Sequence, residues 1–286
     1  TDLSITNDKQ LIIATLRGVN IYNPMTDDFE CIASGDFQNG SSNLLNSNFI
    51  NCILSEEDHI WFGTETGGIN MLSPRRLSIR NYLHNKENPS SLSYNPVNAI
   101  YEDKYGTLWV GTVEGGLNQK EHGSEKFTHF TRDHGGLSHN SVSALTADPD
   151  DHLWIGTWGG GINLLDLKAP QEVLKVISSQ TSSGFPIDFV GSLTYDPETG
   201  TISAPLADKV AENIHGCIGS IIDKEGKLWI GCLEGVYIID LHSRSAAGEF
   251  EYRHLNYKLN DPNSRLIEKI TCFFETKDGT LWLGSS

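Results

Sequence analysis

Hydrophobic residues along this chain occur in short runs separated by polar turns, and no run has the length or the 3.6-residue spacing of a helix. The run at 97–101 is typical, because only Glu102 separates it from the turn Asp103-Lys104-Tyr105-Gly106. Turns rich in Asp, Lys and Gly recur before other runs, as at 223–226. This pattern predicts short β-strands joined by tight turns, and therefore an all-β fold.

One five-residue pattern, Leu-Trp-x-Gly-Thr, returns along the chain with small changes. It occurs at 60–64, 108–112, 153–157, 228–232 and 281–285, and a degenerate copy without Trp occurs at 11–15. Five of the six tryptophans hold the second position of the pattern: Trp61, Trp109, Trp154, Trp229 and Trp282. Its glycines are Gly63, Gly111, Gly156, Gly231 and Gly284, and the first three lie 48 and 45 residues apart. The chain is therefore built from internal repeats.

Each repeat reads as four strands, of which the second carries the Trp. Four short antiparallel strands per repeat predict a blade of a β-propeller. A first-strand position is always small, as the crowded strands nearest the axis require: Cys52, Ala99, Ala144, Gly219 and Cys272. The flat Trp ring can fill the wedge between blades, and the Gly two residues later permits close approach of a neighbour. We therefore assign the repeat Trp and Gly residues to structure.

The repeat predicts one domain over residues 1–286, with blades starting near 1, 49, 97, 142, 190, 217 and 270. The expected fold is a propeller of seven four-stranded blades, of which this chain covers an incomplete ring. The seventh blade ends at its Trp strand. Because the chain lacks an initial Met and starts inside a repeat, we expect it to be a piece of a longer protein.

The fifth blade departs from the repeat. Residues 190–196 match residues 97–103, but the next blade follows 18 residues too soon, and residues 197–202 read as a linker to an outer strand. Either this blade is naturally shortened or residues are missing from the sequence. We favour the second explanation, because a truncated blade would expose sheet edges.

Residues 97–117, VNAIYEDKYGTLWVGTVEGGL, resemble the two-component regulator propeller repeat almost throughout. The resemblance implies the periplasmic sensor region of a Bacteroides-type hybrid two-component system histidine kinase. It implies a parent protein anchored in the inner membrane, an oligosaccharide as the stimulus, and a homodimer as one means of signalling. A kinase core, a receiver and a DNA-binding domain would follow in other parts of that parent.

On a propeller, the loops that leave the second strands and enter the first strands lie on one face, which by analogy is the default ligand site. The variable residues in these loops are Arg17, Glu65, Glu114, Trp158 and Glu234 on one set and Tyr94 and His139 on the other. Trp158 stands outside the repeat position, and its ring can stack on a sugar while carboxylates or Arg bind hydroxyls. Each of these residues can also be a solvated turn residue. Asn48, Asn95 and Asn140 recur in register, so we assign them to turn hydrogen bonding.

The net charge and the lack of known catalytic motifs reduce the number of possible functions. The net charge of −16 disfavours nucleic acid as a partner, and no apolar stretch is long enough to span a bilayer, so membrane contact is assigned to the parent. No P-loop, Gly-x-Ser-x-Gly or zinc motif occurs, so we expect no cofactor or metal and a binding domain rather than an enzyme. A glycan-active enzyme using Glu65, Glu114 and Glu234 stays open, because the spacing of carboxylates in space is invisible in sequence. A scaffold for protein interaction or dimerisation also stays open.

The five cysteines are odd in number and lack metal-ligand spacing. They are Cys31, Cys52, Cys217, Cys232 and Cys272. Most occupy repeat positions filled elsewhere by Val, Ala or Thr, so we interpret them as buried small hydrophobic residues.

Overall fold

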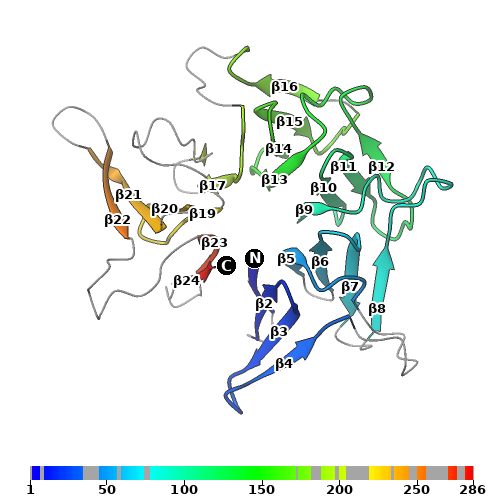
Figure 1. Ribbon diagram of the computed structural model, residues 1–286. Coiled ribbons are helices and arrows are strands. Elements are labelled where there is room, and N and C mark those ends of the chain that lie inside the picture. Colours follow the sequence, from blue (N-terminus) through cyan, green and yellow to red (C-terminus); the bar gives the residue numbers. More distant parts are fainter. Residues whose placement is uncertain are drawn as a thin grey trace.

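The structure, a computed structural model, consists of β-strands arranged as sheets around a common axis (Figure 1). It describes residues 2–6, 10–34, 45–56, 59–73, 78–171, 173–181, 188–196, 200–203, 219–232, 235–244, 250–255, 270–275 and 281–285. These residues form 24 strands and no helix, which confirms the all-β prediction. Accordingly, this part of the chain holds no helix able to cross a membrane.

Five sheets are complete four-stranded antiparallel blades. Blade 1 contains β1 (Asp2–Ile5), β2 (Leu11–Thr15), β3 (Gly18–Asn23) and β4 (Asp28–Ile32). Blade 2 contains β5 (Ile50–Ser55), β6 (Ile60–Thr64), β7 (Ile69–Ser73) and β8 (Ser78–Tyr82). Blade 3 contains β9 (Val97–Glu102), β10 (Leu108–Thr112), β11 (Gly116–Lys120) and β12 (Thr128–Phe130). Blade 4 contains β13 (Val142–Ala147), β14 (His152–Thr157), β15 (Ile162–Asp166) and β16 (Val173–Ile177). Blade 6 contains β19 (Gly219–Ile222), β20 (Lys227–Cys232), β21 (Gly235–Arg244) and β22 (Phe250–Leu255).

The other two sheets have two described strands each, so five rather than seven blades are complete. Blade 5 contains β17 (Thr194–Asp196) and β18 (Thr201–Ser203), and blade 7 contains β23 (Ile270–Glu275) and β24 (Leu281–Ser285). Strand β18 pairs directly with β17, so the interpretation of residues 197–202 as a linker to an outer strand is wrong for residues 201 and 202. The sequence supplies no Trp strand here, and β18 lies beside β17 in its place.

The first strands of the seven sheets form a circle around the axis. Each lies next to the first strand of the following blade, from β1 through β5, β9, β13, β17, β19 and β23, and β23 lies next to β1. The N and C marks accordingly lie near each other at the axis (Figure 1). Within the described residues, the ring is thus incomplete in its outer strands and closed at its centre.

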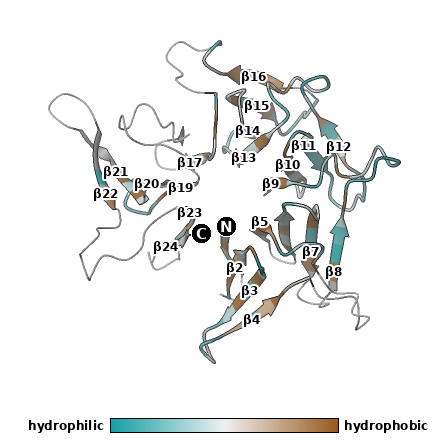
Figure 2. Ribbon diagram, viewed as in Figure 1, coloured by the Kyte–Doolittle hydropathy of each residue, from teal (hydrophilic) through white to brown (hydrophobic). Residues whose placement is uncertain are grey.

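The hydrophobic core lies between blades. Strands β6 and β10 are buried along their whole length, because each is the second strand of a blade sandwiched between two others. Trp61 packs against Val97 and Val110 of blade 3, and Trp109 packs against Leu153 and other residues of blade 4. Outer strands β8 and β12 are mostly hydrophilic, whereas β2 and β23 nearer the axis are mostly hydrophobic (Figure 2). Each large side chain buried in this way contributes about 1.5–3 kcal/mol.

The cysteines do not all follow the prediction. Cys272 is buried and Cys52 is half-buried, while Cys217 and the side chain of Cys232 lie outside the described residues. Cys31 is exposed, which corrects its interpretation as a buried residue. The reason is its place in β4, the outermost strand of blade 1, most of which faces solvent.

A buried carboxylate organises the turn before the Trp strand in blade 3. Asp103 is 5% exposed, and its Oδ1 accepts the backbone N–H groups of Tyr105 at 2.9 Å and Thr107 at 3.0 Å. Its Oδ2 accepts the indole N–H of Trp109 at 2.9 Å. Asp148 and Asp223 accept the indoles of Trp154 and Trp229 in the same way, so one carboxylate ties the turn to the core in three blades.

We expect Asp103→Ala to lower the free energy of unfolding by about 3 kcal/mol, because three donors lose a charged acceptor. Asp103→Asn retains an oxygen for the turn but presents an amide N–H₂ to the indole, so we expect a smaller loss of about 1–2 kcal/mol. Urea unfolding followed by tryptophan fluorescence measures both. Equal midpoints for Asp103→Ala and the wild type would contradict this account.

A second carboxylate, Asp151, joins blade 3 to blade 4. It lies between Lys104 Nζ at 2.5 Å and Lys168 Nζ at 2.9 Å, and its side chain is 6% exposed. The hydrogen bonds from Lys104 and Lys168 lower the pKa of this carboxyl from 3.8 to about 2. A carboxyl with a lowered pKa in the folded state stabilises the fold above its unfolded pKa, and that stabilisation is lost as pH falls.

We therefore expect Asp151→Asn to destabilise the protein at pH 5–7, with the difference from wild type shrinking as pH falls from about 4 to about 2. Asn suits the position because Asp151 has φ +71°, which Asn tolerates. Urea midpoints at several pH values test this. A difference independent of pH would show that the ion pairs do not stabilise the fold.

Candidate functional site

The loops that follow the second strands share one construction. The hydroxyls of Thr64, Thr112 and Thr157 each donate to the carbonyl of the last glycine of the loop at 2.9 Å. In blade 3 this glycine is Gly116, which has φ +81°, and a Cβ there would lie 2.1 Å from the carbonyl oxygen of Phe130. The threonine and the last two positions of the loop are thus fixed by geometry, and the two residues directly after the threonine are free to vary.

The loops that precede the first strands pack against these glycine loops. A Cβ at Gly115 would lie 2.7 Å from Cβ of Tyr94, and one at Gly160 would lie 2.9 Å from Cβ of His139. Tyr94 therefore lies beside the loop that carries Glu114, and His139 lies beside the loop that carries Trp158. In the part of the chain described, these are the predicted site residues that the fold brings together.

Of the other predicted residues, Arg17 and Glu65 lie apart on blades 1 and 2. Arg17 is exposed in the turn between β2 and β3 of blade 1, and Glu65 is exposed after β6 of blade 2. Glu114 is exposed after β10 and has φ +62°, while its backbone N–H donates to Ser141 Oγ of blade 4 at 3.2 Å. Glu234 lies outside the described residues.

Trp158 forms an aromatic pair with Phe189, a residue that the sequence analysis did not identify. Its ring stacks on that of Phe189 with centroids 5.6 Å apart and an angle of 6° between the planes. Trp158 is 37% exposed and Phe189 is 53% exposed, so the stack presents an open ring surface to solvent. The sequence did contain a clue to Phe189. It stands directly before Val190, at a position where the residue differs between blades: the equivalent residues are Phe49, Pro96 and Ser141.

Trp158 also lines a cavity of about 380 Å³ at the propeller axis. The cavity is surrounded by residues on or next to the first strands of several blades, among them Asn51, Asn98, Ser143, Ser192 and Ser220. The Asn51 amide donates to the carbonyl of Val97 at 3.0 Å and the Asn98 amide donates to that of Val142 at 3.3 Å. These side chains connect successive blades and give the axial cavity a polar wall.

Burial shifts the pKa values of two titratable groups in the axial cavity, Asp2 and Cys52. Burial raises the pKa of Asp2 to about 6, although its carboxylate accepts the backbone N–H of Ile53 at 2.6 Å. Burial and the charge of Asp2 raise the pKa of the Cys52 thiol. A thiol with a raised pKa is a poor nucleophile, so Cys52 does not suit covalent chemistry. The described residues contain no group of three His, Cys, Asp or Glu side chains arranged to hold a metal ion.

The recurrent asparagines, which were predicted to make turn hydrogen bonds, accept hydrogen bonds within the loops that lead from one blade to the next. Oδ1 of Asn48, Asn95 and Asn140 accepts the backbone N–H of Ser34, His84 and Arg132 at 2.6–2.7 Å. In blade 5 the equivalent residue is Asp188, which accepts the N–H and hydroxyl of Ser179 at 2.6 Å. Its carbonyl also accepts the N–H groups of Gly159 and Gly161, so Asp188 fixes the Trp158 loop and Phe189 together.

We expect Asp188→Ala to lower the free energy of unfolding by about 1–3 kcal/mol and to weaken the near-ultraviolet circular dichroism of the Trp158–Phe189 stack. Asp188→Asn should remain close to wild type, because asparagine fills this position in the other blades. Urea unfolding and circular dichroism measure the two effects. An Asp188→Asn variant as unstable as Asp188→Ala would contradict the equivalence of these positions.

The chain is similar in fold to solved bacterial propellers. The extracellular domain of the hybrid two component system BT3049 from B. thetaiotaomicron matches 99% of this chain and 38% of its own length, at 20% identity and a TM-score of 0.78. That of BT4673 from the same organism matches 99% of this chain and 51% of its own length, at 17% identity and a TM-score of 0.51. PorZ, a surface component of the type-IX secretion system of Porphyromonas gingivalis, matches 99% and 44%, at 12% identity and a TM-score of 0.51. The chain thus spans 38–51% of the length of these structures.

A family model described as two component regulator propeller matches residues 91–114, 136–159 and 266–286. No curated protein is significantly similar to the chain. The first two matched ranges each contain a leading loop, a first strand and the Trp strand, in blades 3 and 4. The chain therefore folds as a β-propeller, and these three segments of it are similar to the two component regulator propeller repeat.

Proposed function

We propose that this chain is the ligand-sensing domain of a hybrid two-component system, exposed to the periplasm, and that it passes its signal to a histidine kinase elsewhere in the parent protein. The family description and the two B. thetaiotaomicron structures, both described as extracellular domains of such systems, support this role. The net charge of −16 agrees with a ligand other than nucleic acid.

The ligand is an oligosaccharide, and the observation that carries this proposal is the aromatic pair at a polar cavity. Trp158 and Phe189 offer a flat ring surface, against which the C–H face of a sugar can stack. The amides and hydroxyls of the axial cavity can then bind sugar hydroxyls. A cavity of about 380 Å³ is within the size range of small-molecule sites.

We expect Trp158→Ala to weaken oligosaccharide binding by about tenfold or more, because the variant loses the larger ring of the stack. Isothermal titration calorimetry and thermal shift against a panel of neutral and acidic oligosaccharides measure the affinity. At a hundred times the dissociation constant, a ligand should stabilise the wild type by about 2.7 kcal/mol.

Tyr105→Ala is the matched control. Tyr105 is a 50% exposed aromatic residue in the β9–β10 turn, at the other end of its blade. This variant should bind like the wild type. Unchanged affinity in Trp158→Ala would overturn the site, and sugar products formed during incubation would favour a glycan-active enzyme over a sensor.

A further inference from the structure

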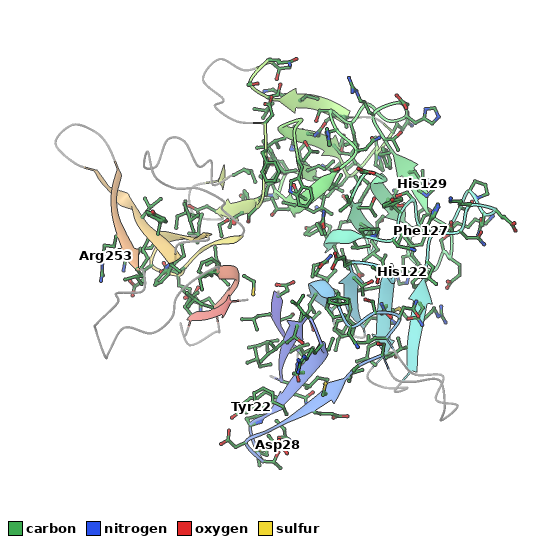
Figure 3. All side chains as sticks on the ribbon, in the orientation of Figure 1. Tyr22, Asp28, His122, Phe127, His129 and Arg253 are labelled. Atoms are coloured by element: carbon green, nitrogen blue, oxygen red, sulfur yellow. The ribbon has the colours of Figure 1, made fainter. Side chains whose placement is uncertain are left out.

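A second cavity, of about 410 Å³, lies between blades 2 and 3. It shares no lining residue with the axial cavity. It lies toward the ends of the strands that are opposite to the Trp158 loop, because it is lined by Gly106 of the β9–β10 turn and by His122 and Gly123 of the β11–β12 connection. Figure 3 shows His122 where blades 2 and 3 face each other. The wall also includes Trp61, Tyr82 and Lys120.

Trp61 breaks the pattern of the other repeat tryptophans. Its indole Nε1 is buried and has no hydrogen-bond partner among the described residues, whereas Trp109, Trp154 and Trp229 each donate to an aspartate. Those aspartates stand six residues before their tryptophans, and Ser55 holds that place in blade 2. A buried N–H without an acceptor destabilises the fold, so an acceptor supplied by a ligand would bind there favourably.

Lys120 is a charged residue at an apolar core position. In the strand register it pairs with Leu108, and the equivalent residues of blades 2, 4 and 6 are Leu72, Leu165 and Ile239. All three are buried, and Lys120 is only 8% exposed. The fold therefore accepts leucine here, and the lysine is not needed for packing.

The Lys120 ammonium has no hydrogen bond or ion pair within the described residues. It lies 5.9 Å from the ring centroid of Trp61 and 5.6 Å from that of Tyr82. Burial lowers the pKa of this lysine, while the charges of Glu125 and Glu102, which also line the cavity, raise it without forming an ion pair with Lys120. At the mouth of the cavity, Arg80 pairs with Glu125 at 2.6 Å, so these two charges neutralise each other.

The cavity thus presents hydrogen-bond donors that lack acceptors. We propose that it binds a small organic carboxylate, whose oxygens accept from Lys120 Nζ and Trp61 Nε1 while its body lies against the rings of Trp61 and Tyr82. A carboxylate supplies both the negative charge and the acceptor oxygens that this buried lysine and indole lack. This site goes beyond the proposed oligosaccharide site and is independent of it.

The test uses isothermal titration calorimetry of the purified chain with three probes at matched ionic strength: glucuronate, benzoate and glucose. We expect at least one carboxylate to bind and glucose not to bind at this site. If glucuronate binds and benzoate does not, the ligand is an acidic sugar. If both bind, the site accepts organic carboxylates in general.

Lys120→Leu should weaken carboxylate binding by more than about tenfold, because it removes the charged partner. The variant should fold, since leucine occupies the equivalent positions, and its Tm should equal or exceed that of the wild type. Trp61→Phe should weaken binding by a smaller factor by removing one donor. Lys126→Leu, which removes an exposed lysine from the same blade, should bind like the wild type.

Two results would overturn the proposal. One is the absence of binding of both carboxylates at millimolar concentration, and the other is equal affinity in Lys120→Leu and the wild type. Trp158→Ala should leave carboxylate binding intact. A negative result for the carboxylate site can therefore be distinguished from a negative result for the oligosaccharide site.

Discussion

The whole molecule depends on the close approach of neighbouring blades at the glycine of the Trp strand. A Cβ at Gly111 would lie 2.5 Å from Cγ1 of Val142, and one at Gly156 would lie 2.7 Å from Cγ1 of Val190. The side chain of the next blade therefore packs directly on backbone. This contact sets the spacing of the blades, and with it the width of the wedge that each Trp ring fills. An added methyl group here forces blades apart rather than filling a void.

Because blade spacing repeats, the sequence could predict most of the fold. The period of the Trp, Gly and small-residue positions led to strands, blades and their order around the axis. Blade 5 could not be derived in this way, since residues 197–202 follow no repeat and β18 was recognisable only from its pairing with β17. Cys31 was misjudged for a related reason, as its burial depends on how far β4 lies from the axis.

The sites were less predictable than the fold, because they lie where repeats differ. Trp158 stood out as a tryptophan outside the pattern, but its partner Phe189 comes from the next blade, and only the structure brings the two rings together. Lys120 and Trp61 were hidden for the opposite reason. Trp61 occupies a regular repeat position that was assigned to structure, no prediction was made for Lys120, and the lack of hydrogen-bond partners of both became visible only in three dimensions.

The two cavities share one geometric property that bears on the proposed signalling role. Trp158 belongs to blade 4 and Phe189 leads into blade 5, while Trp61 belongs to blade 2 and Lys120 to blade 3. A ligand at either place therefore touches two blades, and its binding free energy depends on how those blades are positioned. A ligand shifts a conformational equilibrium only by its difference in affinity for the two states. Boundaries between blades are the places where a propeller of rigid sheets can provide such a difference, because small blade rotations alter contacts there and leave each sheet intact.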